Sequence, residues 1–141
     1  MKKTMFKLGF AAIIAVSVMV SSCGKYEDGP KISLATKKSR MGNEWKLTSA
    51  YKNGVGYSFS GTADVIDVKK DGIYIQTYSS LFGSFSYTGT WSFSSDKESV
   101  TFTPNGSSSS TTFTILRLKG KELWLEKIDG TDKYEYHYDQ N

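Results

Sequence analysis

Residues 84–93 read SFSYTGTWSF, and this stretch decides the fold because its side chains alternate with a period of two. One face of the expected strand carries Phe85, Tyr87, Gly89, Trp91 and Phe93. The opposite face carries only serine and threonine. Since a slip of one residue would exchange the two faces, we expect the aromatic face to be buried and the hydroxyl face to meet water. The glycine within the aromatic row predicts a bend or a close backbone approach.

The same alternation extends from Trp45 to the end of the chain, interrupted by short turn signals. These signals are Asn53-Gly54, Asp71-Gly72, Gly83-Ser84, Ser94-Ser95-Asp96, Pro104-Asn105-Gly106, Lys119-Gly120 and Asp129-Gly130. We expect strands over Glu44–Tyr51, Tyr57–Phe59, Ala63–Lys70, Ile73–Tyr78, Ser84–Phe93, Glu98–Thr103, Thr111–Leu118, Glu122–Ile128 and the C-terminal segment 134–139. Tight links between so many strands predict a meander, which removes its exposed edges by closing. The sequence thus predicts an all-β fold, an antiparallel up-and-down β-barrel of about eight strands over residues 42–141.

The N-terminus has the organisation of a secretory signal peptide. Residues 1–7 contain three lysines and no acidic residue, and Leu8–Val20 is apolar apart from a glycine and a serine. This apolar run is short for a membrane-spanning helix, which needs roughly 20 residues. Val20-Ser21-Ser22-Cys23 resembles the lipobox of bacterial lipoproteins. The resemblance implies cleavage after residue 22 and lipid attachment to Cys23, which is the only cysteine and has no disulfide partner in the chain.

Residues 23–41 are expected to form a lipidated tether that attaches the domain to the membrane. Glycine rather than aspartate follows Cys23, which favours the outer membrane of a Gram-negative bacterium. Residues 25–28 resemble the short acidic signals that export some lipoproteins to the cell surface. The protein is therefore expected either on the outer face of that membrane or on its inner face. The tether is either a flexible spacer or ends in a short helix over Ser33–Met41 that plugs one end of the domain. We favour a flexible start and an ordered end.

The charge of the chain does not indicate nucleic-acid binding. Three of the 18 basic residues lie in the signal peptide, so 15 basic and 14 acidic residues remain, a net charge of +1. These charges are interspersed, with no basic stripe to follow a phosphate backbone. We therefore expect no nucleic-acid partner.

Catalytic chemistry finds little support in the sequence. The chain has one histidine, and its one cysteine is expected to carry the lipid, which excludes Cys/His catalysis and thiolate zinc sites within a monomer. There is also no Gly-x-Ser-x-Gly motif around a serine nucleophile. Glu135, His137 and Asp139 share one face of a strand, at a spacing of roughly 6.6–7 Å that lets one metal take only two of them easily. We interpret them as a solvated polar face opposite a tyrosine row. The sequence predicts a protein that is not an enzyme, with no catalytic residue, metal or cofactor.

Several short motifs resemble the small lipocalin-like lipoproteins of Gram-negative bacteria. The motifs are residues 26–34 of the tether, Trp45-Lys46-Leu47, residues 68–74, Gly89-Thr90-Trp91-Ser92-Phe93, Ile115-Leu116-Arg117-Leu118 and Glu122-Leu123-Trp124-Leu125. Lipocalins usually carry Gly-x-Trp in the first strand, whereas here one extra residue separates Gly42 from Trp45. The resemblance also implies an arginine stacked on that tryptophan, for which only Arg40 and Arg117 are available.

The aromatic content, 14% of all residues, suggests two functions for the barrel interior. The candidate ligand-binding residues are Trp45, Phe85, Tyr87, Trp91, Tyr134 and Tyr136. A barrel of eight strands is just wide enough either to be filled by such side chains or to hold one small ligand. The first hypothesis is a lipid-anchored envelope protein that binds a small, partly apolar ligand. The alternative is a filled barrel that contacts protein or glycan through rim aromatics such as Tyr51, Tyr57 or Phe82, and the sequence identifies no protein partner.

Overall fold

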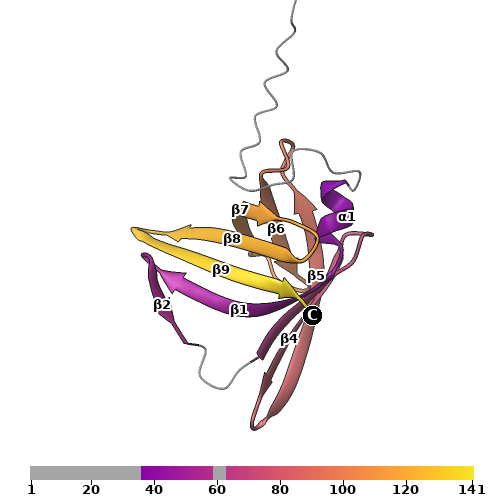
Figure 1. Ribbon diagram of the computed structural model, residues 1–141. Coiled ribbons are helices and arrows are strands. Elements are labelled where there is room, and N and C mark those ends of the chain that lie inside the picture. Colours follow the sequence, from indigo (N-terminus) through magenta and orange to yellow (C-terminus); the bar gives the residue numbers. More distant parts are fainter. Residues whose placement is uncertain (1–35, 59–62) are drawn as a thin grey trace, which may run out of the picture.

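The computed structural model describes residues 36–58 and 63–141 (Figure 1). The expected signal peptide over residues 1–22, the lipidation site Cys23 and most of the tether lie outside these described residues. Within them, no helix is long and apolar enough to cross a membrane.

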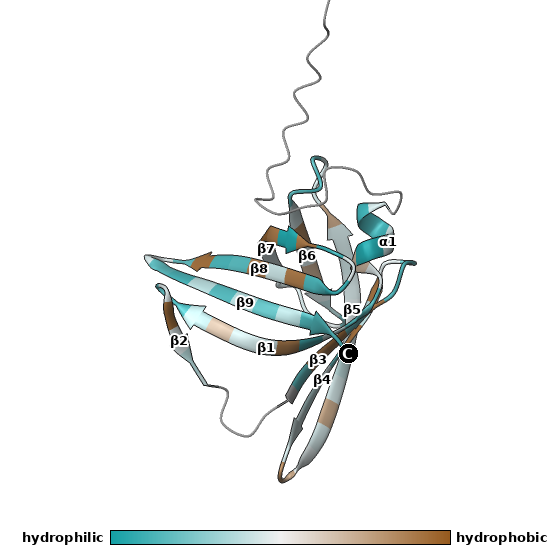
Figure 2. Ribbon diagram, viewed as in Figure 1, coloured by the Kyte–Doolittle hydropathy of each residue, from teal (hydrophilic) through white to brown (hydrophobic). Residues whose placement is uncertain are grey.

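One helix and nine strands make up the described chain. They are α1 Lys37–Met41, β1 Glu44–Lys52, β2 Val55–Tyr57, β3 Ala63–Val68, β4 Ile73–Ser80, β5 Gly83–Phe93, β6 Ser99–Pro104, β7 Thr111–Leu118, β8 Glu122–Asp129 and β9 Asp132–Gln140. The strands pair antiparallel in the order β2-β1-β3-β4-β5-β6-β7-β8-β9, and a further pairing of β1 with β9 closes the sheet. Eight strands therefore form a closed up-and-down barrel, as predicted, and β2 is a short addition beside β1. Hydrophobic residues appear as separate bands along the strands, in keeping with alternation between core and solvent (Figure 2).

The first hairpin shows how local backbone geometry places a strand. Asn53 and Gly54 both have positive φ angles, 52° and 80°, which is the conformation of the two-residue turns that match the twist of a hairpin. The turn pairs Lys52 with Val55, so β2 begins directly after it. The predicted strand Tyr57–Phe59 therefore began two residues too late, and Phe59 lies outside the described residues.

Gly89 confirms the predicted close approach within the aromatic row. A Cβ atom at this position would collide with the carbonyl oxygen of Thr103 and would lie 2.5 Å from Cε1 of Tyr74. Only glycine lets β5 pass this closely over the Tyr74 ring.

The aromatic face of β5 is buried over only part of its length. Trp91 is 6% exposed, but Phe85 is 65% exposed, which differs from the prediction of a wholly buried face. The reason is strand overlap: β5 pairs with β4 from Gly83 to Thr90, whereas its pairing with β6 covers only Gly89 to Phe93. The outer half of the β4–β5 hairpin thus extends beyond the core.

The helix α1 closes one end of the barrel. Thr36 caps it by accepting a hydrogen bond from the backbone N–H of Ser39 (3.0 Å), and Met41 at its end is fully buried. The indole Nε1 of Trp45 donates to the carbonyl oxygen of Met41 (2.9 Å). A short plugging helix was predicted over Ser33–Met41; its described part is the five residues of α1.

Arg117, rather than stacking on Trp45, lies over the ring of Trp124, with 3.6 Å from Cζ to the ring centroid. Trp124 is the cross-strand partner of Arg117 in β7 and β8, so strand register brings the pair together. Arg40, the other candidate, instead has a buried Nε without a hydrogen-bond partner among the described atoms. Neither described arginine is stacked on Trp45.

Candidate ligand-binding site

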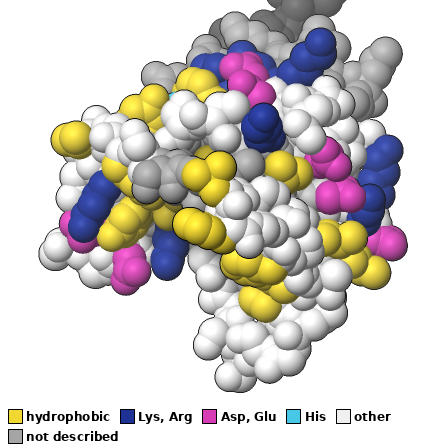
Figure 3. All heavy atoms as spheres, turned by 90° about the horizontal axis from the view of Figure 1, so that it is seen from below, with side chains coloured by type: hydrophobic (Ala, Val, Ile, Leu, Met, Phe, Trp, Pro, Cys, Tyr) yellow, Lys and Arg dark blue, Asp and Glu magenta, His cyan; other side chains and the backbone are white. Residues whose placement is uncertain are grey.

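The end of the barrel opposite α1 contains a cavity of about 230 Å³. Its lining consists of Asp64, Ile66, Tyr74, Gln76, Tyr78, Tyr87, Phe102, Pro104, Thr111, Phe113, Leu125, Tyr136 and Tyr138. Asp64 near the start of β3, Pro104 at the end of β6 and Thr111 at the start of β7 all belong to the barrel end distant from α1. Seen from below the view of Figure 1, hydrophobic side chains gather across the middle of the molecule and charged ones lie mostly toward its edges (Figure 3).

A hydrogen-bonded chain of polar side chains crosses one wall of this cavity. Nε2 of Gln76 donates to Oδ1 of Asp64 (2.8 Å), and Oε1 of Gln76 accepts from the hydroxyl of Tyr87. The hydroxyls of Tyr87 and Tyr78 are 3.4 Å apart. Strand register explains the arrangement, because Asp64 is paired with Tyr78 across β3 and β4, and Gln76 with Tyr87 across β4 and β5.

The rest of the wall is a chain of aromatic rings in edge-to-face contact. Centroid distances along it are 6.2 Å from Tyr87 to Tyr74, 5.0 Å from Tyr74 to Phe102, 6.1 Å from Phe102 to Phe113 and 6.0 Å from Phe113 to Tyr136. These rings come from five different strands, so the chain of contacts runs around much of the barrel. Edge-to-face contacts of this kind hold rings in defined orientations. The cavity therefore combines an ordered apolar wall with one polar corner.

Burial sets the protonation of the polar corner. It raises the pKa of the Asp64 carboxyl, and the hydrogen bond from Gln76 partly offsets this rise. Burial also raises the pKa of Tyr78, Tyr136 and Tyr138 above the usual value, with the negative charge of Asp64 contributing in each case. For Tyr74 burial raises the pKa to about 12. At neutral pH these hydroxyls keep their protons, so each can both donate and accept hydrogen bonds.

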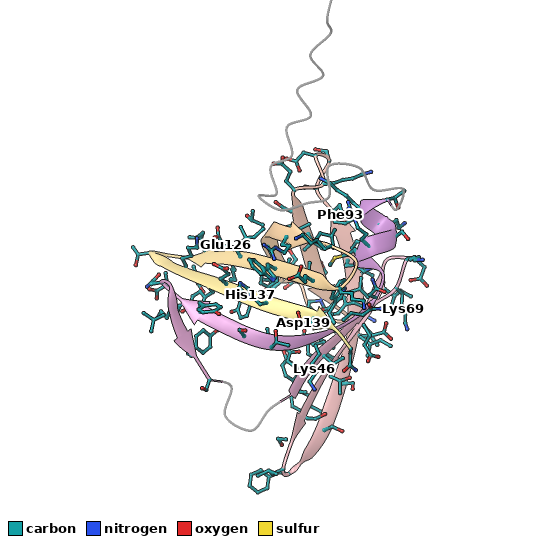
Figure 4. The ribbon with its side chains drawn as sticks, in the orientation of Figure 1. Lys46, Lys69, Phe93, Glu126, His137 and Asp139 are labelled. Carbon is teal, nitrogen blue, oxygen red and sulfur yellow. The ribbon has the colours of Figure 1, made fainter. Side chains whose placement is uncertain are left out.

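Two of the six candidate residues lie on the cavity wall. Tyr87 and Tyr136 line it, whereas Trp45 and Trp91 do not. Trp45 is fully buried beside α1, and Nε1 of Trp91 donates to the carbonyl oxygen of Lys69 (2.7 Å) at the same end of the barrel, where Figure 4 labels Lys69. Both indoles are thus packed and hydrogen-bonded near the plugged end.

The other two candidates lie beyond the cavity. Phe85 packs on Tyr78 with 5.3 Å between ring centroids and otherwise faces solvent. Tyr134 lies beneath Lys52, whose Nζ is 5.4 Å from the ring centroid, in a shallow apolar groove formed with Val55 and Tyr57. The structure does not bring Phe85 or Tyr134 together with Tyr87 and Tyr136 around one cavity.

Sequence reasoning missed Asp64 and Gln76, which form the polar corner. Alternation within β3 places Asp64 on the same face as Ile66 and Val68, both of which are buried. A carboxylate on an inward-facing row is the signal that could have identified the site. Gln76 likewise lies on the inward-facing row of β4 with Tyr74 and Tyr78, and its register opposite Tyr87 brings it into the hydrogen-bonded chain.

The outer face of β9 differs from the solvated polar row that the sequence predicted. The ring of His137 stacks on Trp124, with 4.0 Å between centroids and 4° between planes, and its Nε2 lies 2.6 Å from Oε1 of Glu135. Asp139, on the same strand in Figure 4, is exposed. No group of three His, Cys, Asp or Glu side chains positioned to hold a metal occurs in residues 36–58 and 63–141.

A closed antiparallel barrel of eight strands with one plugged end defines the class of lipocalin-like barrels, which typically bind rather than catalyse. A family model for lipocalin-like domains matches residues 42–125, and the chain belongs to this lipocalin-like domain family. The crystal structure of a lipocalin-like protein from Bacteroides uniformis superimposes with a TM-score of 0.60 at 12% sequence identity, covering 72% of this chain and 99% of that one. That similarity concerns the fold alone. A search of curated proteins found no significant match.

Proposed function

We propose that the protein is a lipid-anchored envelope lipoprotein whose barrel binds a small, partly apolar ligand in the cavity opposite α1. The observation that carries the proposal is the cavity of about 230 Å³, walled by ordered aromatic rings and containing one polar corner. A largely apolar pocket with a few convergent polar groups is the usual form of a small-molecule site. The family membership supports a binding role in general and leaves the ligand open.

The size of the cavity limits the ligand. A cavity of about 230 Å³ lies at the small end of ligand pockets, which typically measure about 300–1,000 Å³. A ligand of about ten non-hydrogen atoms fills a comparable volume, so the proposal concerns a single ring or a short chain.

Native mass spectrometry tests the binding proposal. The mature chain, residues 23–141 with Cys23→Ser to prevent acylation, would be purified gently from a cellular host. We expect a reproducible small-molecule adduct. Thr111→Trp should abolish it by filling the cavity, whereas Thr112→Trp should retain it, because Thr112 is exposed on the opposite face of β7. A clean apo mass, with no thermal shift across a panel of small amphiphiles, would reject the proposal.

The anchor part of the proposal rests on Val20-Ser21-Ser22-Cys23. We propose lipidation at Cys23 and location in the outer membrane, with display at the cell surface suggested by residues 25–28. Cys23→Ala should abolish lipid labelling and release the protein from membranes. Protease shaving of intact cells would then distinguish surface display from an inward-facing barrel.

The exposed apolar tip of the β4–β5 hairpin favours a second candidate function, contact with a protein or glycan at the envelope. Leu81 is 93% exposed and Phe82 is fully exposed, with Phe85 directly behind them. Tyr57 is 37% exposed on the neighbouring rim, whereas Tyr51 is half-buried against His137. Loss of a captured envelope partner in Phe82→Ser, with small-molecule binding retained, would support this second role.

A further inference from the structure

We infer that the cavity selects a small amine, with the Asp64 carboxylate as the counter-ion of the ligand's ammonium group. The inference rests on the proposed function and narrows it to one chemical class, a primary amine carried by a single ring or a short apolar chain.

The first argument is the isolation of the Asp64 carboxylate inside the barrel. Oδ1 accepts one hydrogen bond from Gln76, and no lysine, arginine or histidine among the described residues forms an ion pair with Asp64. Asp67, three residues along the same strand but on its outer face, is paired with Lys69. A carboxylate kept in a barrel interior without a cation costs stability unless something binds it. The ligand's ammonium group is the partner that the described side chains do not supply.

The second argument is the chemistry around this carboxylate. Tyr78, Tyr136 and Tyr138 line the same cavity as Asp64, and burial, with a contribution from the charge of Asp64, raises the pKa of each hydroxyl. An ammonium has three donors, which Asp64, the Gln76 carbonyl and the tyrosine oxygens can accept. The rings of Tyr74, Tyr87 and Tyr136 also line the cavity, and aromatic rings attract cations when water is excluded.

The third argument concerns the ligands that the polar corner around Asp64 would exclude. A ligand carboxylate would face Asp64 at short range, and two like charges in a partly buried site repel strongly. A purely apolar ligand would leave the carboxylate without its water and without a replacement. Charge and cavity size together therefore disfavour long-chain fatty acids and favour compact amines.

Three probes that share one ring test the inference: phenethylamine, 2-phenylethanol and 3-phenylpropionate. Binding to the mature chain, residues 23–141 with Cys23→Ser, would be measured by isothermal titration calorimetry at pH 7.5. We expect phenethylamine to bind at least tenfold more tightly than 2-phenylethanol, and 3-phenylpropionate to bind most weakly. Asp64→Asn should weaken phenethylamine binding at least tenfold and leave 2-phenylethanol within twofold. Near-UV circular dichroism would verify that the variant is folded.

Asp67→Asn is the matched control, because it removes the same charge from the same strand on the opposite face. Asp67→Asn should change the affinity for each probe by no more than twofold. A loss of phenethylamine affinity equal to that in Asp64→Asn would overturn the inference, because it would show that the net charge of the strand, and not a contact with Asp64, attracts the amine. Equal affinity of the amine and the alcohol, or equal loss of both in Asp64→Asn, would also overturn it while the proposed ligand site stands. If none of the three probes binds and native mass spectrometry shows only the apo mass, both the amine inference and the proposed ligand site are rejected.

Discussion

The two ends of this barrel are built from different kinds of residue. At the α1 end Met41, Trp45, Val68, Leu118 and Leu123 are at most 2% exposed, and the indole of Trp45 is hydrogen-bonded to the helix. At the opposite end the inward-facing positions carry a carboxylate, an amide and several tyrosine hydroxyls, only part of which are buried. One end buries apolar surface, which is the main favourable term in folding, and the other keeps polar groups that contribute little to it. The comparison indicates that the stabilising core and the proposed ligand site are divided along the barrel axis.

The largest expected effect comes from removing the plug contact at the α1 end. Trp45→Ala should lower the free energy of unfolding by about 3–5 kcal/mol, because it leaves a cavity in a closely packed region. It also removes the donor to the Met41 carbonyl. Urea denaturation at pH 7 would measure the loss. Tyr136→Phe at the other end is the comparison variant and should lower the free energy of unfolding by less than half as much. Equal losses in the two variants would contradict the proposed difference between the two ends of the barrel.

Gly89→Ala tests the packing between the two ends. The new Cβ would meet the Thr103 carbonyl and the Tyr74 ring, so we expect a loss of about 1–3 kcal/mol in the free energy of unfolding. Gly120→Ala is the control, since a Cβ there meets nothing within 4 Å. Thermal unfolding of both variants would check this, and a tolerated Gly89→Ala would show that β5 can move away from Tyr74.

Asp64→Asn should show how much the carboxylate at the polar end of the barrel lowers the stability of the fold. Burial raises the folded-state pKa of Asp64 above 3.8, so its contribution to stability is fully present at pH values below 3.8 and is lost as the pH rises through the folded-state pKa. The variant should therefore melt slightly higher than the parent at pH 7 and at the same temperature near pH 3.5. Differential scanning calorimetry at the two pH values would measure the difference.

Asp132 provides a control of opposite sign for that experiment. Its hydrogen bonds with Lys52 and Asn53 lower its pKa, so its contribution is present above pH 3.8 and is lost as the pH falls through the lowered value. Asp132→Asn should therefore reduce stability at pH 7 and make less difference in acid.

For Asp64→Asn, by contrast, destabilisation at pH 7 would contradict the view that the Asp64 carboxylate is kept for binding.

Phe82→Ser should have the smallest effect on folding. The side chain is fully exposed at the tip of the β4–β5 hairpin, so the free energy of unfolding should change by less than about 0.5 kcal/mol. Urea denaturation would check this. A larger loss would show that the hairpin tip packs in solution and belongs to the stabilising part of the molecule.

Alternation in the sequence predicted the closed barrel and most of its strands, because the period of two depends only on which face of a strand meets the core. The turn signals worked for the same local reason: Asn53, Gly54 and Gly130 adopt the positive φ angles that their residue types favour in hairpin turns. The candidate site was predicted less well. Tyr87 and Tyr136 were named and line the cavity, but so were four aromatics that lie elsewhere.

Those four residues show what a single sequence leaves undetermined. Alternation places Phe85, Tyr87 and Trp91 on one face, but their depth along the barrel depends on how far β6 extends beside β5. That overlap leaves Phe85 in solvent and Trp91 near the plug. The meeting of Asp64, Gln76 and Tyr87 depends likewise on the registers of β3 with β4 and of β4 with β5.

The sequence by itself therefore determined the fold class, the order of strands and the face of most side chains, because these follow from local periodicity and turn chemistry. The exceptions are the bulges in β1 and β7, where the register shifts. The tertiary structure decided which end of the barrel is filled and which is hollow. It also brought one carboxylate, one amide and several tyrosines together from strands far apart in the chain. The physical reason is that strand register and overlap arise from packing of the whole barrel, which no short segment contains.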